Sequence, residues 1–333
     1  MMKFGIETEI VHLLFQNKRI DAKGFIKKAA EFGYDGVILN TVEKKNLREG
    51  LGTIGKDTTE NLTEIRDLLR KYHLYVEIDT RGTDYDHICH ILSVAEFLGA
   101  ERIRTFIMGD ASTYSDSKLG GDFSIENIRH GIEDIKKIIP ELKKRRIFLQ
   151  LENHELETAE EMKAIMDEIN SPWVGILFDP GNYLNAWQDP LDALNVIAPY
   201  VNATHMKDVL VCMNGDEPVI TGAMTGKGSV NQKAILRKLL QDTCIQRLNI
   251  EGGYLYTGGF SRPRGTGGTS EFKGTFAVKE PPVPADEVLP NDYYLYDGPL
   301  LDKLMQEQME NMRMSILYYK NLIRELEKEK ERM

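Results

Sequence analysis

The amino-acid sequence predicts an α/β fold, a (β/α)8 barrel in which eight parallel strands are surrounded by helices. Two observations favour this fold. Short apolar segments alternate eight times with amphipathic helical segments, and the turns from helix to strand are short while several loops from strand to helix are long. Such alternation implies parallel strands with right-handed crossovers. An open doubly wound sheet is the main alternative, but no Gly-x-Gly-x-x-Gly motif follows the first strand to support its dinucleotide-binding form.

The predicted strands are short apolar runs, and several of them end in polar residues. They span residues 3–10, 36–40, 75–80, 102–108, 147–154, 173–179, 201–208 and 247–252. The predicted helices span residues 21–31, 58–72, 88–98, 124–144, 158–170, 190–198 and 231–241. Because barrels commonly exceed the usual length of a domain, we expect residues 1–333 to form a single barrel domain.

Local signals place the ends of these helices. Asp21 and Ser124 can each cap a helix N-terminus with a side-chain oxygen, and Thr58 or Thr59 can cap the second helix. Gly33 and Gly99 are expected to end helices just before a strand. The long loops therefore follow the strands, and in a barrel the functional residues lie on that side.

Residues 253–298 form the longest predicted loop, an insertion that leaves the eighth strand on the catalytic face. Their glycines and prolines are incompatible with a continuous helix, and ordered loops of this length are uncommon unless they are functional. Five tyrosines of the insertion could line a substrate pocket or a partner surface: Tyr254, Tyr256, Tyr293, Tyr294 and Tyr296. A surface loop without function is the alternative.

A long C-terminal helix is predicted over residues 300–330. Its apolar residues recur at spacings of three and four, which defines one buried face. The stripe consists of Leu301, Met305, Met309, Met312, Ile316, Tyr319, Ile323 and Leu326. Packing against the barrel explains this stripe more simply than a separate groove for a partner does.

Composition excludes several classes of function. The hydrophobic content of 41% is ample for a core, and the net charge of −10 argues against nucleic acid or an anionic membrane as a partner. The three cysteines, Cys89, Cys212 and Cys244, are widely spaced and suit reduced thiols. No signal-peptide pattern and no run of about twenty apolar residues is present, so we expect a cytoplasmic protein.

The candidate chemistry begins at the fifth strand, which reads Ile-Phe-Leu-Gln-Leu-Glu-Asn-His from Ile147. Side chains two apart on a strand share a face, so Glu152 and His154 should emerge side by side where the strand ends. A carboxylate and an imidazole in this arrangement suit a metal ligand beside a base. Taken alone, the segment is equally compatible with an ordinary polar strand end.

Four consecutive strand ends each offer a potential metal ligand: Glu152, Asp179, His205 and Glu251. Barrel closure should aim these side chains at a common point. Three carboxylates and one imidazole suit a hard divalent ion, Mn²⁺ foremost, with Mg²⁺ or Zn²⁺ as alternatives. A purely structural cluster is disfavoured, because the carboxylates would repel one another without a metal ion.

The motifs around these residues resemble those of the sugar phosphate isomerase/epimerase family, the xylose isomerase-like TIM barrels. The similarity covers nearly the whole chain up to the eighth strand and includes Leu-Glu-Asn-His at Glu152, Phe-Asp-Pro-Gly-Asn at Asp179, His-Met-Lys-Asp at His205 and Asn-Ile-Glu-Gly-Gly at Glu251. The resemblance implies that these four residues bind a divalent metal, which in turn binds neighbouring carbonyl and hydroxyl oxygens of a sugar.

A mechanism follows from such a site. A metal that holds a ketone oxygen stabilises an enediolate, so a nearby base can remove the adjacent proton. His154 is the candidate base, with a structural hydrogen-bonding role as the alternative. Lys207 should face inward and could stabilise developing negative charge, although a salt bridge to Asp208 or another carboxylate is equally compatible.

The resemblance leaves two main reactions open. In the epimerases of the family, Glu152 and Glu251 would pass protons on opposite faces of a ketose. The histidine beside the metal and the long aromatic insertion instead resemble the alpha subunit of the C-glycoside deglycosidases. That resemblance implies a lyase that removes the proton beside the ketone of a 3-oxo-glycoside and eliminates an aromatic aglycone. It also implies a small beta subunit docking near the insertion, and we expect an oligomer.

Two further classes of function are alternatives. A DNA-repair endonuclease of the same barrel superfamily would have a basic groove and more metal-binding histidines, which the net charge of −10 opposes. A non-catalytic binding subunit would leave the metal site unused. Metal analysis of the purified protein separates this last class from the enzymes.

Overall fold

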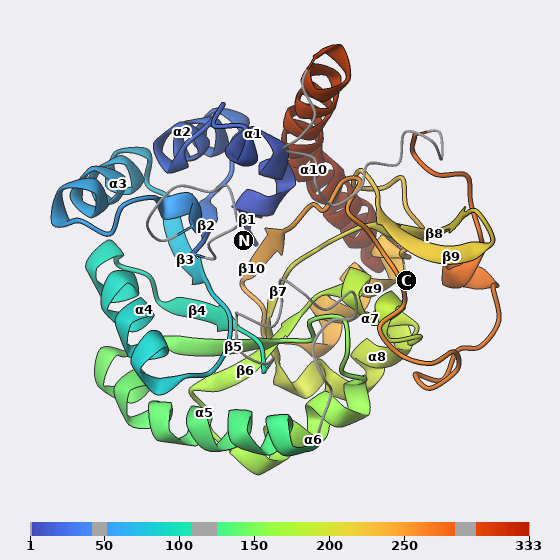
Figure 1. Ribbon diagram of the computed structural model, residues 1–333, viewed down its shortest axis with the longest axis horizontal. Helices are drawn as coiled ribbons and strands as arrows, with labels where there is room; N and C mark the ends of the chain where they lie inside the picture. Colours follow the sequence, from blue (N-terminus) through green and yellow to red (C-terminus); the bar gives the residue numbers. More distant parts are fainter. Residues whose placement is uncertain (1, 42–51, 108–124, 284–297, 333) are drawn as a thin grey trace.

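Eight parallel strands form the barrel that the sequence predicts, as Figure 1 shows in a view close to the barrel axis. The computed structural model describes residues 2–41, 52–107, 125–283 and 298–332. The strands of the barrel are β1 (Lys3–Glu7), β2 (Gly36–Asn40), β3 (Tyr75–Asp79), β4 (Arg102–Thr105), β5 (Phe148–Glu152), β6 (Val174–Phe178), β7 (Val201–Thr204) and β10 (Arg247–Ile250). β10 pairs with β1, and a parallel bridge between Met206 and Ile250 closes the barrel between β7 and β10.

The barrel helices lie outside the strands, close to their predicted bounds. They are α2 (Ala22–Phe32), α3 (Thr59–Tyr72), α4 (Tyr85–Leu98), α5 (Ile125–Arg145), α6 (Ala159–Ile169), α8 (Pro190–Ile197), α9 (Gln232–Asp242) and α10 (Pro299–Glu331). Asp21 caps α2 and Thr58 caps α3, as predicted, and Gly33 and Gly99 end their helices in the left-handed conformation. The predicted cap Ser124 lies outside the described residues.

The loops after β1 and β6 contain short helices that the sequence did not predict. η1 (Thr8–Val11) and α1 (His12–Gln16) follow β1, which ends three residues before its predicted end. α7 (Pro180–Asn185) follows β6, with η2 (Gly52–Ile54) and η3 (Ala198–Tyr200) elsewhere. β1 and β6 therefore both end earlier than predicted.

The segment after β7 differs most from the prediction. It was predicted as a glycine-containing loop, but residues of this segment form an antiparallel hairpin of β8 (Val209–Asn214) and β9 (Glu217–Gly222). A two-residue turn that begins with Gly215 at a φ of 62° joins the strands, which is a common hairpin connection. The hairpin extends outward from the barrel in Figure 1.

The described part of the predicted insertion, residues 253–283, crosses the loops after β5 and β6, and we call it the strap. It contains β11 (Thr257–Gly258), which pairs with β9, and η4 (Gly274–Phe276). The Trp187 ring stacks on Phe260 at a centroid distance of 3.8 Å, and the Arg262 guanidinium pairs with Glu161. The strap is therefore an ordered rim, while Tyr293, Tyr294 and Tyr296 lie outside the described residues.

One close approach of backbone joins the hairpin to the strap. A Cβ atom at Gly222 would lie 1.7 Å from the carbonyl oxygen of Gly253, so only glycine fits at this position. The Gly222 N–H donates to Tyr256 O at 2.8 Å, and the Leu255 N–H donates to Gly222 O at 3.0 Å.

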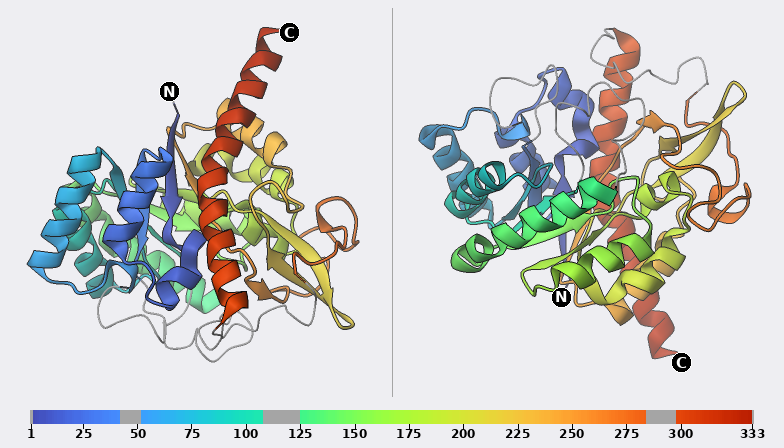
Figure 2. Two further views of the ribbon diagram at one scale, coloured as in Figure 1. Left: turned by 90° about the horizontal axis from the view of Figure 1, so that it is seen from above. Right: turned by 60° about the horizontal axis from the view of Figure 1, so that its bottom comes forward.

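α10 closes the ring of helices, because it packs against η1 and α1 on one side and α9 on the other. Figure 2 shows this helix running along the barrel, with its C-terminal end projecting past it. The predicted stripe is buried at Met312, Ile316 and Tyr319, whereas Met309 and Ile323 are half-buried. No helix among the described residues is long and apolar enough to span a membrane.

Candidate metal centre

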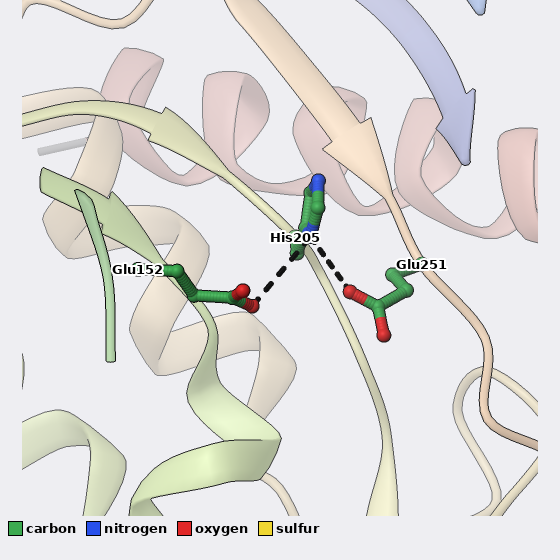
Figure 3. A group of neighbouring side chains, drawn as sticks. All are labelled: Glu152, His205 and Glu251. Atoms are coloured by element: carbon green, nitrogen blue, oxygen red, sulfur yellow. Dashed lines mark ion pairs between the residues drawn. The ribbon is translucent and has the colours of Figure 1, made fainter. Parts of the chain in front are cut away.

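Three of the four predicted ligands lie together at the C-terminal mouth of the barrel. Glu152 ends β5, His205 follows β7 and Glu251 follows β10. One candidate ligand atom of each residue lies within 4.8 Å of the other two. The Nδ1 atom of His205 is 2.7 Å from Oε2 of Glu251 and 3.6 Å from Oε1 of Glu152, as the dashed lines in Figure 3 mark.

These three side chains fit a divalent ion. Glu152 and His205 are almost fully buried, and Nε2 of His205 makes no hydrogen bond to any residue that the structure describes. A buried ring nitrogen without a hydrogen bond is costly unless another group binds it. Two carboxylates and one imidazole offer the oxygen and nitrogen donors that Mn²⁺, Mg²⁺ and Zn²⁺ accept.

His205 and Glu251 each stabilise the charged form of the other. Burial opposes the charged form of His205, but the Glu251 carboxylate outweighs burial and raises the pKa of the imidazole. Burial would likewise raise the pKa of Glu251, yet Lys207 and then His205 hold it well below its usual range. Glu251 is therefore an ionised carboxylate, as a metal ligand must be.

Asp179, the fourth predicted ligand, follows β6 but makes other contacts. Its Oδ1 atom accepts from the Gly181 N–H at 2.7 Å and the Asn182 N–H at 3.2 Å, so it caps α7. Its Oδ2 atom is 2.7 Å from Nζ of Lys207. The assignment of Asp179 as a ligand stays a prediction, since its ligand atoms are not among the three that cluster.

Lys207 bridges two of the predicted ligands. Its Nζ atom lies 2.7 Å from Asp179 and 3.1 Å from Glu251. Burial favours the neutral amine, but these two carboxylates outweigh burial and raise the pKa of Lys207 above its ordinary value. Asp208 is not its partner, because the Asp208 carboxylate accepts backbone N–H groups of residues 226–230.

His154, the predicted base, lies half-buried beside this centre. Its ring stacks on Phe106 with centroids 4.1 Å apart and an interplanar angle of 10°. Burial, and after it the positive charges of Arg104 and Arg81, hold the pKa of His154 well below its usual range. The imidazole is therefore neutral near pH 7, which is the state a base requires.

Sequence reasoning missed the arginine that holds Glu152. Arg104 of β4 donates to Asp79 Oδ1 at 2.6 Å and forms an ion pair with Glu152 through its second terminal nitrogen. The other oxygen of Glu152 accepts from Asn182 Nδ2 at 3.2 Å. Both oxygens of Glu152 are thus fixed by donors from neighbouring strands and loops, as metal-ligating carboxylates commonly are.

Two signals in the sequence could have identified these neighbours. Arg102 and Arg104 alternate with apolar residues in a short strand, so both must point into the barrel. Asp79 and Glu7 end β3 and β1, just as Glu152 ends β5. Burial, with Glu9 and Asp79 as further causes, raises the pKa of Glu7 well above its usual range.

A buried carboxyl group in the loop after β5 gives a testable dependence of stability on pH. Burial raises the pKa of Glu157 from 4.5 to about 7, so folding takes up a proton between these values. Stability should fall as pH rises from about 4.5 to 7, by up to about 3 kcal/mol. For Glu157→Gln we expect a smaller loss of Tm between pH 5 and pH 8 in calorimetry. The exposed Glu168→Gln is the control, and an equal loss in wild type and Glu157→Gln contradicts the prediction.

Comparison with known proteins places this barrel in a family of enzymes. The family model of the xylose isomerase-like TIM barrels matches residues 26–251, about two thirds of the chain. The chain therefore belongs to the xylose isomerase-like TIM barrel family, whose members include sugar isomerases and epimerases.

Two curated relatives and one solved structure are similar to the chain. The uncharacterized protein YihM of Escherichia coli is 22% identical over 69% of this chain and 65% of its own length. The 3-oxo-isoapionate decarboxylase of Pectobacterium atrosepticum is 28% identical over 44% of this chain and 49% of its own. The alignments thus span about two thirds and half of these relatives. A D-psicose 3-epimerase crystallised with D-fructose has a TM-score of 0.63 at 16% identity, over 96% of this chain and 99% of its own.

Proposed function

We propose that the protein is a divalent-metal-dependent lyase that acts on an oxidised glycoside. It removes the proton beside the ketone of a 3-oxo-glycoside and eliminates the aglycone, as in C-glycoside deglycosylation. The observation that supports this proposal best is that each of the two facing carboxylates is held by a cation. Arg104 pairs with Glu152, and Lys207 lies 3.1 Å from Glu251.

A carboxylate held by a cation is a weak base. The positive charge stabilises the ionised form, so the carboxylate keeps its role as a ligand and accepts a proton poorly. His154 is neutral and lies beside these residues, so we assign it as the base, although burial, Arg104 and Arg81 lower its pKa and so also weaken it as a proton acceptor. This arrangement favours a reaction with one base over an epimerisation that needs two.

A single base is sufficient for the elimination. His154 takes the proton from the carbon beside the ketone, and the electrons of the broken C–H bond form an enediolate. When the ketone re-forms, the bond to the aglycone breaks, and a double bond forms between the anomeric carbon and its neighbour. The aglycone carbon takes up the proton that His154 received, so no oxidant or reductant is required.

The residues around the site would stabilise the negative charge of the enediolate. Glu152, Asp179, His205 and Glu251 would hold the metal ion, Mn²⁺ foremost, which supplies a positive charge beside the ketone oxygen. Lys207 adds a second positive charge between Asp179 and Glu251. The relative named 3-oxo-isoapionate decarboxylase also supports a substrate with a 3-oxo group.

The test uses an aromatic 3-oxo-C-glucoside and D-fructose with the Mn²⁺-loaded protein. We expect release of the aglycone and no epimerisation, and His154→Gln should lower kcat by roughly 10²–10⁴-fold while Mn²⁺ affinity is kept. His90→Gln, at an exposed histidine paired with Asp57, is the control. Turnover of D-fructose alone, with His154→Gln still active, would refute the lyase.

A ketose epimerase or isomerase is the second candidate. Glu152 and Glu251 face each other across His205, as Figure 3 shows, and two carboxylates on opposite sides are what proton exchange on both faces of a sugar requires. The fold shared with the D-psicose 3-epimerase is compatible with this reaction.

A small second subunit and an oligomeric state belong to the same proposal. The strap crosses the loops after β5 and β6, on the face of the barrel where a beta subunit would dock. Copurification of a small protein that raises the lyase activity of the tagged chain supports this partner, and lyase activity that no copurified protein raises contradicts it.

A further inference from the structure

Three side chains from η1, the end of β2 and the strap meet beside the metal centre, and we call them the rim cluster: Glu9, Asn40 and Tyr256. The Tyr256 hydroxyl donates to Oε2 of Glu9 at 3.0 Å, and Nδ2 of Asn40 lies 3.4 Å from Oε1 of Glu9. The Tyr256 ring stacks on His12 with centroids 4.0 Å apart and an interplanar angle of 16°. Segments far apart in the sequence are thus held together at one place.

The rim cluster borders the metal centre on the side of β1 and β10. The Glu9 N–H donates to the Glu7 carboxylate. After burial, the negative charges of Glu9 and Glu251 are among the causes that raise the pKa of Glu7. A Cβ atom at Gly253 would lie 3.3 Å from Cδ2 of Tyr256 and 3.9 Å from Cδ of Lys207. The space beside the Gly253 backbone is therefore bordered both by the Tyr256 ring and by the lysine of the centre.

The groups of the rim cluster suit a polyol. Glu9 and Tyr256 are half-buried, so a ligand at the mouth of the barrel can reach them, whereas Asn40 is buried and holds the Glu9 carboxylate in place. A carboxylate accepts hydrogen bonds from hydroxyl groups, and an aromatic ring packs against the apolar C–H face of a sugar. A few placed polar groups beside apolar surface are typical of a specific ligand site.

We propose that the rim cluster is a subsite for the hydroxyl groups of the sugar whose ketone is bound at the metal centre. Glu9 accepts hydrogen bonds from ring hydroxyls, and Tyr256 orients Glu9 and packs against the sugar. This inference rests on the proposed function, because it assumes a sugar at the centre. A site that binds a hydroxyl group strongly rejects an analogue that lacks it, so the subsite selects hydroxylated substrates.

The chain offers a matched control for this subsite. Tyr254 lies two residues before Tyr256, but its hydroxyl bonds to Glu307 on α10 at 3.1 Å. Tyr254 and Glu307 thus form the same kind of hydrogen bond, from a tyrosine hydroxyl to a glutamate carboxylate, as Tyr256 and Glu9 do, but between the strap and α10. Tyr254→Phe and Glu307→Gln report the structural effect of losing such a bond, without the effect on a ligand.

The test measures binding separately from turnover. The Mn²⁺-loaded variants Glu9→Gln and Tyr256→Phe are titrated calorimetrically with methyl 3-oxo-glucopyranoside and its monodeoxy analogues. We expect Kd for the parent sugar to rise by about 10-fold or more, with at least one deoxy analogue showing no further loss. In steady-state assays KM should rise while kcat changes by less than about threefold.

Different outcomes separate this inference from the proposed function. Binding by the wild type without release of an aglycone, lost in Glu9→Gln, refutes the lyase and supports the subsite. Turnover by the wild type with Glu9→Gln and Tyr256→Phe indistinguishable from Tyr254→Phe overturns the subsite and leaves the lyase. A fall in kcat at unchanged Kd, or no binding of any probe by the wild type, also overturns the subsite.

Discussion

Glu152→Gln is expected to lower the affinity for Mn²⁺ by at least about 100-fold and to abolish turnover. Glu152 contributes one of the three clustered ligand atoms and is buried at the end of β5. Mutation of groups that only support a ligand already costs about 10–100-fold in metal affinity, and loss of the ligand should cost more. Calorimetric titration of the metal-free protein measures the change.

Glu77→Gln provides the matched control for this experiment. Glu77 is an equally buried carboxylate inside the barrel, but it pairs with Arg247 at 2.9 Å and accepts from Asn249 at 2.7 Å, away from the cluster. Its removal should leave Mn²⁺ affinity nearly unchanged. An affinity of Glu152→Gln within about threefold of wild type would show that the ion binds elsewhere.

Arg104→Met should lower the free energy of unfolding by about 3–5 kcal/mol. Arg104 is the buried cation between Asp79 and Glu152, and both carboxylates are themselves buried. Removal of one partner from a buried ion pair leaves an uncompensated charge, which is the costly case. Urea unfolding of the metal-free protein measures the loss.

Saturation with Mn²⁺ should restore part of this stability, because the ion supplies positive charge to Glu152. Arg145→Met is the control, since Arg145 pairs at the surface with Glu96 and Glu141 and should cost less than about 1 kcal/mol. A loss of similar size in both variants would mean that burial of the Arg104 pair is not what stabilises the fold.

Much of the fold could be predicted because its signals are local. Alternating apolar strands and amphipathic helices set the order of the barrel elements, and single residues such as Asp21 and Gly33 set helix ends. The hairpin of β8 and β9 was missed because its strands are half-exposed and pair with each other, so no helix separates them. The stripe of α10 was predicted, but not that Gln308 of this helix accepts the Leu13 N–H at 3.0 Å.

The candidate site was predictable to the extent that it lies at strand ends. Glu152, His205 and Glu251 meet because parallel strands end on the same side of a barrel. The pairing of Lys207 with Asp179 and the role of Arg104 depend on which side chains reach across the barrel, and strand periodicity gives a direction but no partner. The rim cluster combines residues of η1, β2 and the strap, which lie far apart in the sequence, and no spacing rule predicts such a meeting.

The way the strap is attached affects how the substrate range of such a barrel can change in evolution. Its anchors are Trp187, which packs on Phe260, and Glu161, which pairs with Arg262, and none of them belongs to the clustered ligands. Residues between these anchors and η4 are held at the same place, since the Thr269 N–H donates to Trp187 O at 3.0 Å. Changes in this stretch are therefore expected to alter the rim rather than the strand ends. A different strap would change the size of substrate that the barrel accepts. Exchange of straps between relatives is therefore a direct way to engineer substrate range.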